Sequence, residues 1–267
     1  MEKVIHYCWF GGNPLPELAQ KCIASWRKFC PDYEIREWNE QNFDMNSCDY
    51  IREAVEQKKW AFASDYARFK ILHQLGGLYF DTDVELVAPI DDIVAQGPFM
   101  AFEKRLDGDM VNPGLGLGAE PGMAFYEKVL HSYETSHFYE NGEMKLYSVV
   151  ERVTDLLKQE GLGDSTELQT IAGLTLYPHD YFCPLCYDDQ VLTTTENTRS
   201  IHWYDASWLD ERMKKRQKRS AAIRRRMPGK FGNLINKIYI KASYLWEWTV
   251  TGQLLKKIKG KLTKKNG

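Results

Sequence analysis

The 267-residue sequence has no long uncharged apolar run, so no segment is expected to cross a bilayer as a helix. Cysteine is also sparse: six residues are scattered along the chain, and only Cys183 and Cys186 form a Cys-x-x-Cys pair. A structural zinc site needs four ligands, and no second pair stands at a fitting distance. We therefore expect reduced thiols in a cytosolic chain and no zinc ribbon.

The composition is that of a folded α/β protein. Hydrophobic residues make up 43% and aromatic residues 13% of the chain, which is enough to build a full core. The pattern of apolar residues predicts strands at 4–10, 33–38, 77–80, 99–103 and 175–177, and helices at 16–29, 51–56, 60–75, 123–134 and 145–161. Strands that alternate with helices predict a mostly parallel sheet flanked by helices, with its ligand site at the carboxyl ends of the strands.

Two aspartates stand at one of these strand ends. Asp81 and Asp83 follow the apolar run 78–80, just after the glycine pair at 76–77. Carboxylates one residue apart can bind a hard divalent cation such as Mn²⁺ or Mg²⁺, and this cation can neutralise nucleotide phosphates. In the preceding helix, Asp65 and Arg68 are three residues apart and share a face. By spacing alone, a solvated loop and a surface ion pair remain alternatives.

Three segments together resemble a known family. Residues 63–68 with 75–83, the amino-terminal strand and glycine turn at 4–12, and the segment 202–208 are similar to the DXD-motif sugar-binding region of glycosyltransferases. That family includes yeast-type initiating mannosyltransferases, bacterial capsule and lipopolysaccharide enzymes and, more distantly, the glucosylating domains of clostridial toxins. The matches lie in family order over about the first 210 residues. The resemblance implies a GT-A-like fold.

The resemblance also implies roles for the residues around the motif. Asp65 and Arg68 would bind hydroxyls of the donor sugar, and Tyr79 would lie near the ribose. Asp81 would contact the ribose and sugar or reach the metal through water. Asp83 would be the direct ligand of Mn²⁺ or Mg²⁺.

Further residues would complete the donor site by the same resemblance. Trp9 would stack on or near the base, and His202 would stand at the metal. The segment 202–208 would close over the diphosphate, with Ser207 and Trp208 at the phosphates.

The glycine-rich segment 112–119 has no Gly-x-Gly-x-x-Gly spacing and therefore does not fit a dinucleotide fingerprint. In glycosyltransferases of this type, the corresponding stretch lies along the donor and acceptor walls. Asn112 is accordingly a donor-binding candidate, and Glu103 is a second site candidate, with an ordinary loop as the alternative for either residue alone.

The reaction implied by the family is transfer of a hexose from a nucleotide sugar, with retention of anomeric configuration. UDP-hexose is the favoured donor and GDP-mannose is possible. The acceptor would be a glycan or a lipid-linked sugar in capsular or other surface polysaccharide synthesis. Cleavage of the donor develops negative charge on the departing phosphate, so a bound cation and fixed hydrogen-bond donors stabilise the transition state.

The two ends of the chain carry opposite charge. Residues 1–208 contain 17 Lys and Arg against 34 Asp and Glu, whereas residues 209–267 contain 18 against 3. We therefore expect a catalytic domain at 1–208 and a basic amphipathic helical tail at 209–267. The tail has aromatics interleaved with lysines, which favours a membrane-surface contact through 212–260, with packing on its own domain or an oligomer contact as alternatives.

The acidic catalytic half argues against nucleic acid as a partner. Because the first residues run directly into a predicted strand, no signal peptide is expected. These features together favour a cytoplasmic protein that is peripheral on the inner face of the cytoplasmic membrane.

Two other function classes remain open from the sequence. An aspartate-nucleophile phosphatase also places Asp-x-Asp after an apolar strand. That pattern prefers Thr or Val two residues after the second aspartate, where this chain has Glu85. A non-catalytic membrane-associated adaptor is the other alternative, and the complete set of Asp65, Arg68, Asp81 and Asp83 argues against it.

Overall fold

The structure is a computed structural model that describes residues 1–140, 143–145, 147–205 and 211–250. The chain divides into two compact units. The first contains residues 1–187 with 192–208, and the second contains residues 188–191 with 209–267.

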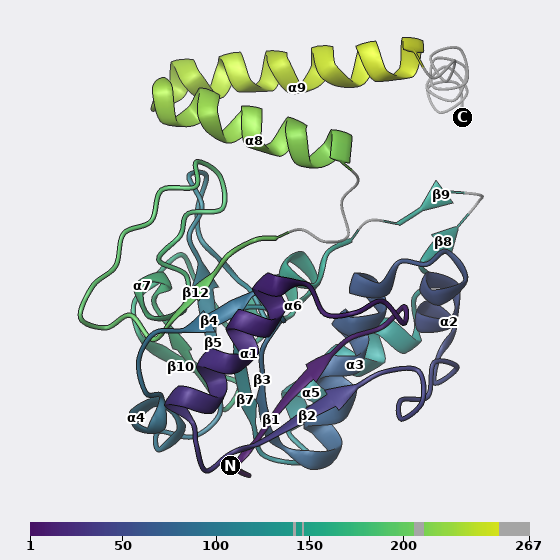
Figure 1. The fold of residues 1–267 in the computed structure, drawn as a ribbon, viewed down its shortest axis with the longest axis vertical. Helices are drawn as coiled ribbons and strands as arrows, with labels where there is room; N and C mark the ends of the chain where they lie inside the picture. Colours follow the sequence, from purple (N-terminus) through teal and green to yellow (C-terminus); the bar gives the residue numbers. More distant parts are fainter. Residues whose placement is uncertain (141–142, 146, 206–210, 251–267) are drawn as a thin grey trace. The chain divides into compact units, whose positions relative to one another are not determined.

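The first unit is built on an eight-stranded mixed sheet (Figure 1). The strand order is β10-β11-β5-β7-β3-β1-β2, and β6 pairs with β5. Strands β1, β2, β3, β5 and β11 run in the same direction, whereas β6, β7 and β10 run against them. The bounds are β1 Val4–Cys8, β2 Glu34–Trp38, β3 Gly77–Tyr79, β5 Phe99–Glu103, β6 Met110–Val111, β7 Leu117–Ala119, β10 Gln169–Ile171 and β11 Leu174–Tyr177.

Two short antiparallel pairs lie outside this sheet. Strands β4 Val84–Leu86 and β12 Ser200–His202 form one pair, and β8 Tyr139–Glu140 and β9 Glu143–Met144 form the other.

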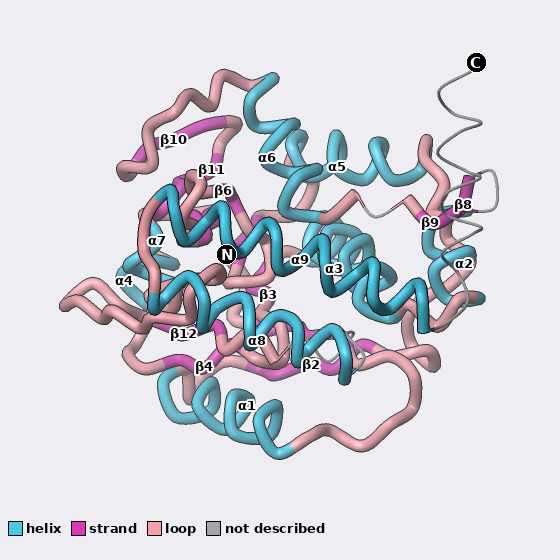
Figure 2. Tube along the Cα trace, turned by 90° about the horizontal axis from the view of Figure 1, so that it is seen from above, coloured by secondary structure: helices cyan, strands magenta, loops and turns pink. Residues whose placement is uncertain are grey.

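Helices cover both faces of the sheet. Figure 2 shows α3, α5 and α6 on one side of the strands and α1 on the other. The bounds are α1 Glu17–Phe29, α2 Asp49–Glu56, α3 Trp60–Leu75, α4 Asp91–Val94, α5 Ala124–Glu134, α6 Val149–Gln159 and α7 His179–Phe182.

Each central strand contributes to two hydrophobic clusters because alternate side chains point to opposite faces. Met100 and Phe102 of β5 pack in the cluster under α2, α3, α5 and α6, whereas Phe99 and Ala101 pack in the cluster under α1. This explains why the strands read as nearly continuous apolar runs.

The predicted fold class is confirmed as a mostly parallel α/β sheet flanked by helices. All five predicted strands and all five predicted helices are present, with bounds that agree within a few residues. The prediction missed the two- and three-residue strands β4, β6, β7, β8, β9, β10 and β12 and the four-residue helices α4 and α7, because such short segments carry little periodicity. Of these, β4, β7 and β12 also pair with distant parts of the chain.

The second unit contains the helices α8 Glu211–Arg226 and α9 Lys230–Val250. The chain turns between them at Gly229, whose φ of +86° lies in the left-handed region that favours glycine. The guanidinium of Arg216 on α8 is paired with the Glu247 carboxylate and lies 3.8 Å from the ring centroid of Tyr244, both on α9. Among the helices that the structure describes, none is long and apolar enough to cross a membrane.

Candidate active site

The first aspartate of the motif lies in a turn directly after β3. The backbone N–H of Val84 donates to the carbonyl of Asp81 at 3.0 Å and closes the turn. Strand β3 lies next to β1 in the middle of the sheet, and the two run parallel. The turn therefore lies at the carboxyl end of a central strand, where ligands of α/β proteins commonly bind.

A buried arginine holds two of the predicted site carboxylates together. Arg68 lies 2.8 Å from Asp65 and 3.1 Å from Asp81, measured from Nη2 to Oδ1 in both pairs. The side chain of Arg68 is only 3% exposed, and its guanidinium lies 5.0 Å from the ring centroid of Tyr79. The Tyr79 hydroxyl donates to Asp81 Oδ1 at 3.3 Å. Helix α3 and strand β3 thus form one connected polar cluster.

Burial controls the protonation of this cluster. It raises the pKa of Asp65 to about 7, against the opposing charge of Arg68. It also raises the pKa of Asp81, again against Arg68. The pKa of Arg68 is raised in spite of its own burial because the Asp81 and Asp65 carboxylates favour its charged form.

The second aspartate is held by a segment more than 100 residues further along the chain. Strand β12 pairs with β4 in a register that places His202 opposite Val84, and His202 Nε2 lies 3.0 Å from Asp83 Oδ1. The backbone N–H of Asp205 donates to Asp83 Oδ2 at 2.9 Å. Burial opposes the charge of Asp83, but His202 and the hydrogen bonds outweigh it, so the pKa of Asp83 is lowered. The pKa of His202 is raised by Asp83 against the effect of burial.

Three side chains at this point can bind a divalent cation. Ligand atoms of Asp81, Asp83 and His202 all lie within 4.8 Å of one another. His202 Nδ1 is buried and has no hydrogen-bond partner among the described residues. Two carboxylates with an imidazole suit Mn²⁺ better than Mg²⁺, which prefers a shell of oxygen ligands. The residues therefore fit the metal that the family resemblance implies.

A loop after β6 presses against Asp81. A Cβ on Gly114 would lie 2.3 Å from Asp81 Oδ2, which is closer than real Cβ contacts allow, so only glycine fits without movement. Asn112 Oδ1 accepts from the Gly114 N–H at 2.7 Å, and the Asn112 amide donates to the buried Glu103. In this structure, Asn112 and Glu103 shape the wall beside the motif.

The remaining predicted residues lie as follows. Trp9 follows β1 and is partly buried, with its indole N–H donating to the carbonyl of Asn13. Tyr79 is 1% exposed. Its hydroxyl donates a hydrogen bond to Asp81, and its ring lies against the guanidinium of Arg68. Ser207 and Trp208 lie outside the described residues.

The sequence reasoning missed Gly114, Tyr204 and the Asp205 backbone N–H. Tyr204 has a φ of +50°, an uncommon value for a residue with a side chain, and its ring centroid lies 4.2 Å from that of His202. The turn at Tyr204 precedes the N–H that reaches Asp83. The only feature of the sequence that pointed to Tyr204 was its position two residues after His202. The backbone strain at Tyr204 is visible only in the fold.

The family comparison agrees with the resemblance seen in the sequence. Residues 16–100 match the model of the glycosyltransferase sugar-binding region containing DXD motif, a range that includes Asp65, Arg68, Asp81 and Asp83. No curated protein matches the sequence. Among solved structures, the PaToxG glycosyltransferase is similar, with a TM-score of 0.47 and 18% identity over 60% of this chain and 70% of that chain.

Proposed function

We propose that this chain, whose residues 16–100 match the glycosyltransferase sugar-binding region containing DXD motif, transfers a hexose from a nucleotide sugar to a glycan or lipid-linked acceptor with retention of anomeric configuration. The observation that carries the proposal is the Asp81, Asp83 and His202 cluster at the carboxyl end of β3, next to the buried Arg68. This assignment replaces the phosphatase and adaptor alternatives. Both alternatives leave the match to a sugar-binding region without a role.

A divalent cation, with Mn²⁺ favoured over Mg²⁺, would be held by Asp83, with Asp81 and His202 beside it. When bound, it supplies charge that stabilises the departing nucleoside diphosphate. Asp83 is suited to this role because its lowered pKa keeps it ionised at neutral pH.

The donor sugar would be held by the carboxylates that Arg68 organises. Asp65 and Asp81 accept hydrogen bonds from sugar hydroxyls, and the bonds from Arg68 fix the direction of both carboxylates. Because Arg68 is buried, we infer that it acts on the sugar mainly by positioning these two aspartates. Fixed carboxylates orient the anomeric carbon toward the incoming hydroxyl group.

UDP-hexose is the favoured donor and GDP-mannose is the alternative. Capsule or related surface-polysaccharide synthesis, at the inner face of the cytoplasmic membrane, is the proposed setting. It is supported by the basic tail.

The proposal is tested with a panel of nucleotide sugars, each with Mn²⁺, with Mg²⁺ and with a chelator. We expect one donor to stabilise the protein against heat and to be hydrolysed slowly, in both cases only with metal. Proton NMR of the first released sugar identifies its anomer, and retention predicts the configuration of the donor. Release of the opposite anomer would rule out the retaining mechanism.

The same panel is repeated with the variant Asp83→Ala, which removes the proposed metal ligand. Because a bound metal contributes several kcal/mol to the transition state, we expect metal-dependent turnover to fall on the order of 1,000-fold. Circular dichroism should show an unchanged fold. Wild-type turnover by this variant, with or without chelator, would contradict the assignment of Asp83 as a metal ligand.

A further inference from the structure

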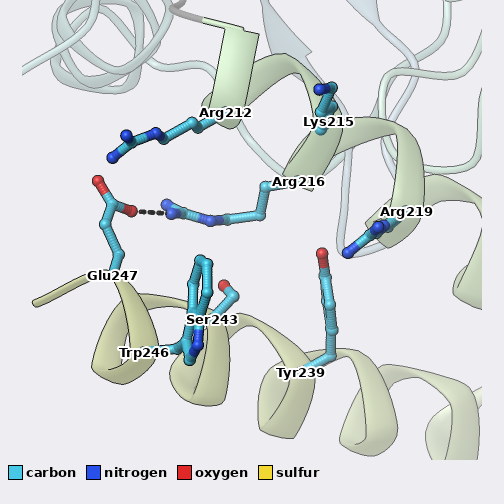
Figure 3. A pocket seen from close by; sticks show the side chains of 8 residues that line it. All are labelled: Arg212, Lys215, Arg216, Arg219, Tyr239, Ser243, Trp246 and Glu247. Atoms are coloured by element: carbon cyan, nitrogen blue, oxygen red, sulfur yellow. Dashed lines mark hydrogen bonds and ion pairs between the residues drawn. The ribbon is translucent and has the colours of Figure 1, made fainter. Parts of the chain in front are cut away.

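A groove between α8 and α9 is lined by an unusual number of positive charges (Figure 3). Its α8 side carries Arg212, Lys215, Arg216 and Arg219. These positions follow the i, i+3, i+4, i+7 spacing of one helical face, so all four cations share the side of α8 that faces α9. The sequence therefore concentrates charge in the groove by helix geometry alone.

Only one of these cations is neutralised in the described part of the second unit. Arg216 crosses the groove to the carboxylate of Glu247, as Figure 3 shows. Arg212, Lys215 and Arg219 are exposed and have no ion pair with any described residue. Three like charges that line one groove repel each other, and an anion bound between them relieves that repulsion.

The groove also contains groups that complement a phosphate. Tyr239 and Ser243 on α9 contribute hydroxyl donors, and the two free arginines contribute planar guanidinium groups that can bind two phosphate oxygens at once. Trp246 forms part of the same lining and is 70% exposed. The tryptophan ring is apolar except for its N–H group, and such residues are enriched at the interface between water and lipid.

An apolar stripe runs along α9 outside the groove. Phe231, Leu234, Ile238 and Leu245 are 67%, 55%, 59% and 51% exposed, respectively. Their spacing places them on one face of the helix. So many exposed large apolar side chains on one face require an apolar partner. A nucleic acid would neutralise the cations but would leave these side chains in water.

We propose that the α8–α9 groove binds the phosphodiester of an anionic phospholipid, and that the apolar stripe of α9 enters the interfacial layer of the same bilayer. Arg212, Lys215 and Arg219 contact the phosphate, and Trp246 lies at the level of the headgroups. The helix then lies in the plane of the membrane surface, as amphipathic helices with basic polar faces do.

The test compares two variants of the full chain that lose the same charge. The groove variant carries R212Q, K215Q and R219Q; the control carries K218Q, R225Q and R226Q, which removes one Lys and two Arg outside the groove lining. Each is sedimented with vesicles of phosphatidylcholine alone and of equal parts phosphatidylcholine and phosphatidylglycerol. We expect binding only to the anionic vesicles, with affinity lowered on the order of 100-fold in the groove variant and roughly 10-fold or less in the control.

Several outcomes would overturn the proposal. Equal losses in the two variants would indicate diffuse attraction with no phosphate site. Equal binding to pure phosphatidylcholine would remove the role of the anion. Release by inorganic phosphate, but not by sodium chloride of the same ionic strength, would indicate a site for a soluble anion.

Tight binding of single-stranded RNA that is lost only in the groove variant would assign the groove to nucleic acid and overturn the lipid proposal. If the triple variant loses helicity, the three single substitutions give the same comparison. The vesicle assay needs no nucleotide sugar, so its result is independent of the proposed transferase reaction.

Discussion

At the scale of single residues, the position of Asp81 depends on the absence of a side chain at Gly114. The Gly114 Cα lies so close that a Cβ would meet both Asp81 Oδ2, at 2.3 Å, and Asn112 Oδ1, at 3.1 Å. A well-packed site responds to an added methyl group by moving its neighbours. The neighbour here is a predicted catalytic carboxylate.

We therefore expect Gly114→Ala to lower kcat/KM on the order of 100-fold, since a displacement of about 1 Å in a positioned group has this effect. The concentration of Mn²⁺ needed for half-maximal activity should rise as well. Gly163→Ala is the control, because a Cβ there meets nothing within 4 Å. Equal activity in the two variants would show that Asp81 has room to move without loss.

Arg68 is the residue whose removal should affect both stability and activity. Arg68→Met keeps much of the side-chain volume but leaves Asp65 and Asp81 without their buried counter-charge. Removing one partner of a buried ion pair costs about 3 to 5 kcal/mol. We expect a clearly lower melting temperature together with loss of nucleotide-sugar hydrolysis.

The comparison variant for Arg68 is Arg52→Met on α2. Arg52 also has a carboxylate three residues away, Asp49, but both side chains are about half exposed. Such an exposed pair contributes little, so the melting temperature should stay near that of the wild type. Similar melting temperatures for the two variants would mean that Arg68 is not the counter-charge of this site.

At the scale of elements, His6 on β1 connects β2 with Gly76, the residue between α3 and β3. Its Nε2 donates to the carbonyl of Gly76 at 3.1 Å, and the Trp38 indole N–H donates to its Nδ1 at 3.1 Å. Nδ1 must accept that bond, so the ring must be neutral. Burial accordingly lowers the pKa of His6 from 6.5 to about 4.

This arrangement predicts a loss of stability in mild acid. Below pH 6.5 the unfolded chain takes up a proton at His6 that the folded chain does not, so stability falls as the pH drops from 6.5 to about 4. The full effect is about 3 kcal/mol. His6→Gln keeps one donor and one acceptor but does not titrate, so its melting temperature should fall less between pH 7 and pH 5. Parallel pH profiles for the two proteins would argue against this role of His6.

At the scale of the whole molecule, the charge division and the two compact units have nearly the same boundary. The acidic part at 1–208 contains the sheet and the candidate site, and the basic part at 209–267 contains α8 and α9. Strands and helices of the first unit contact one another, and α8 contacts α9 in the second unit. The proposed catalytic site and the proposed lipid-binding groove therefore lie in different units.

We expect a chain truncated after residue 210 to keep metal-dependent hydrolysis of the donor, within about twofold of the full chain, and to lose vesicle binding. Circular dichroism checks that the truncated chain is folded, and hydrolysis of the donor is measured in detergent-free buffer. Loss of the folded state on truncation would show that the first unit needs α8 and α9 for stability.

The order of the strands and helices in the first unit was predictable from the sequence because it depends on local periodicity. The run at 78–80, for example, has too many apolar residues to face water on either side. The Asp81 and Asp83 pair was predictable for the same reason, since both follow that strand. The proximity of Asp81 to Arg68 followed from the helix that precedes the strand and from the family resemblance.

Other parts of the site were decided only by the tertiary structure. The sequence places Asn112 in a glycine-rich loop, but it does not indicate that Gly114 packs against Asp81. It identifies His202 only by resemblance, whereas the contact with Asp83 depends on the pairing of two three-residue strands far apart in the chain. Local periodicity determines which segments form strands and helices, but register between distant strands depends on the packing of the whole core, and that register brings the site residues together.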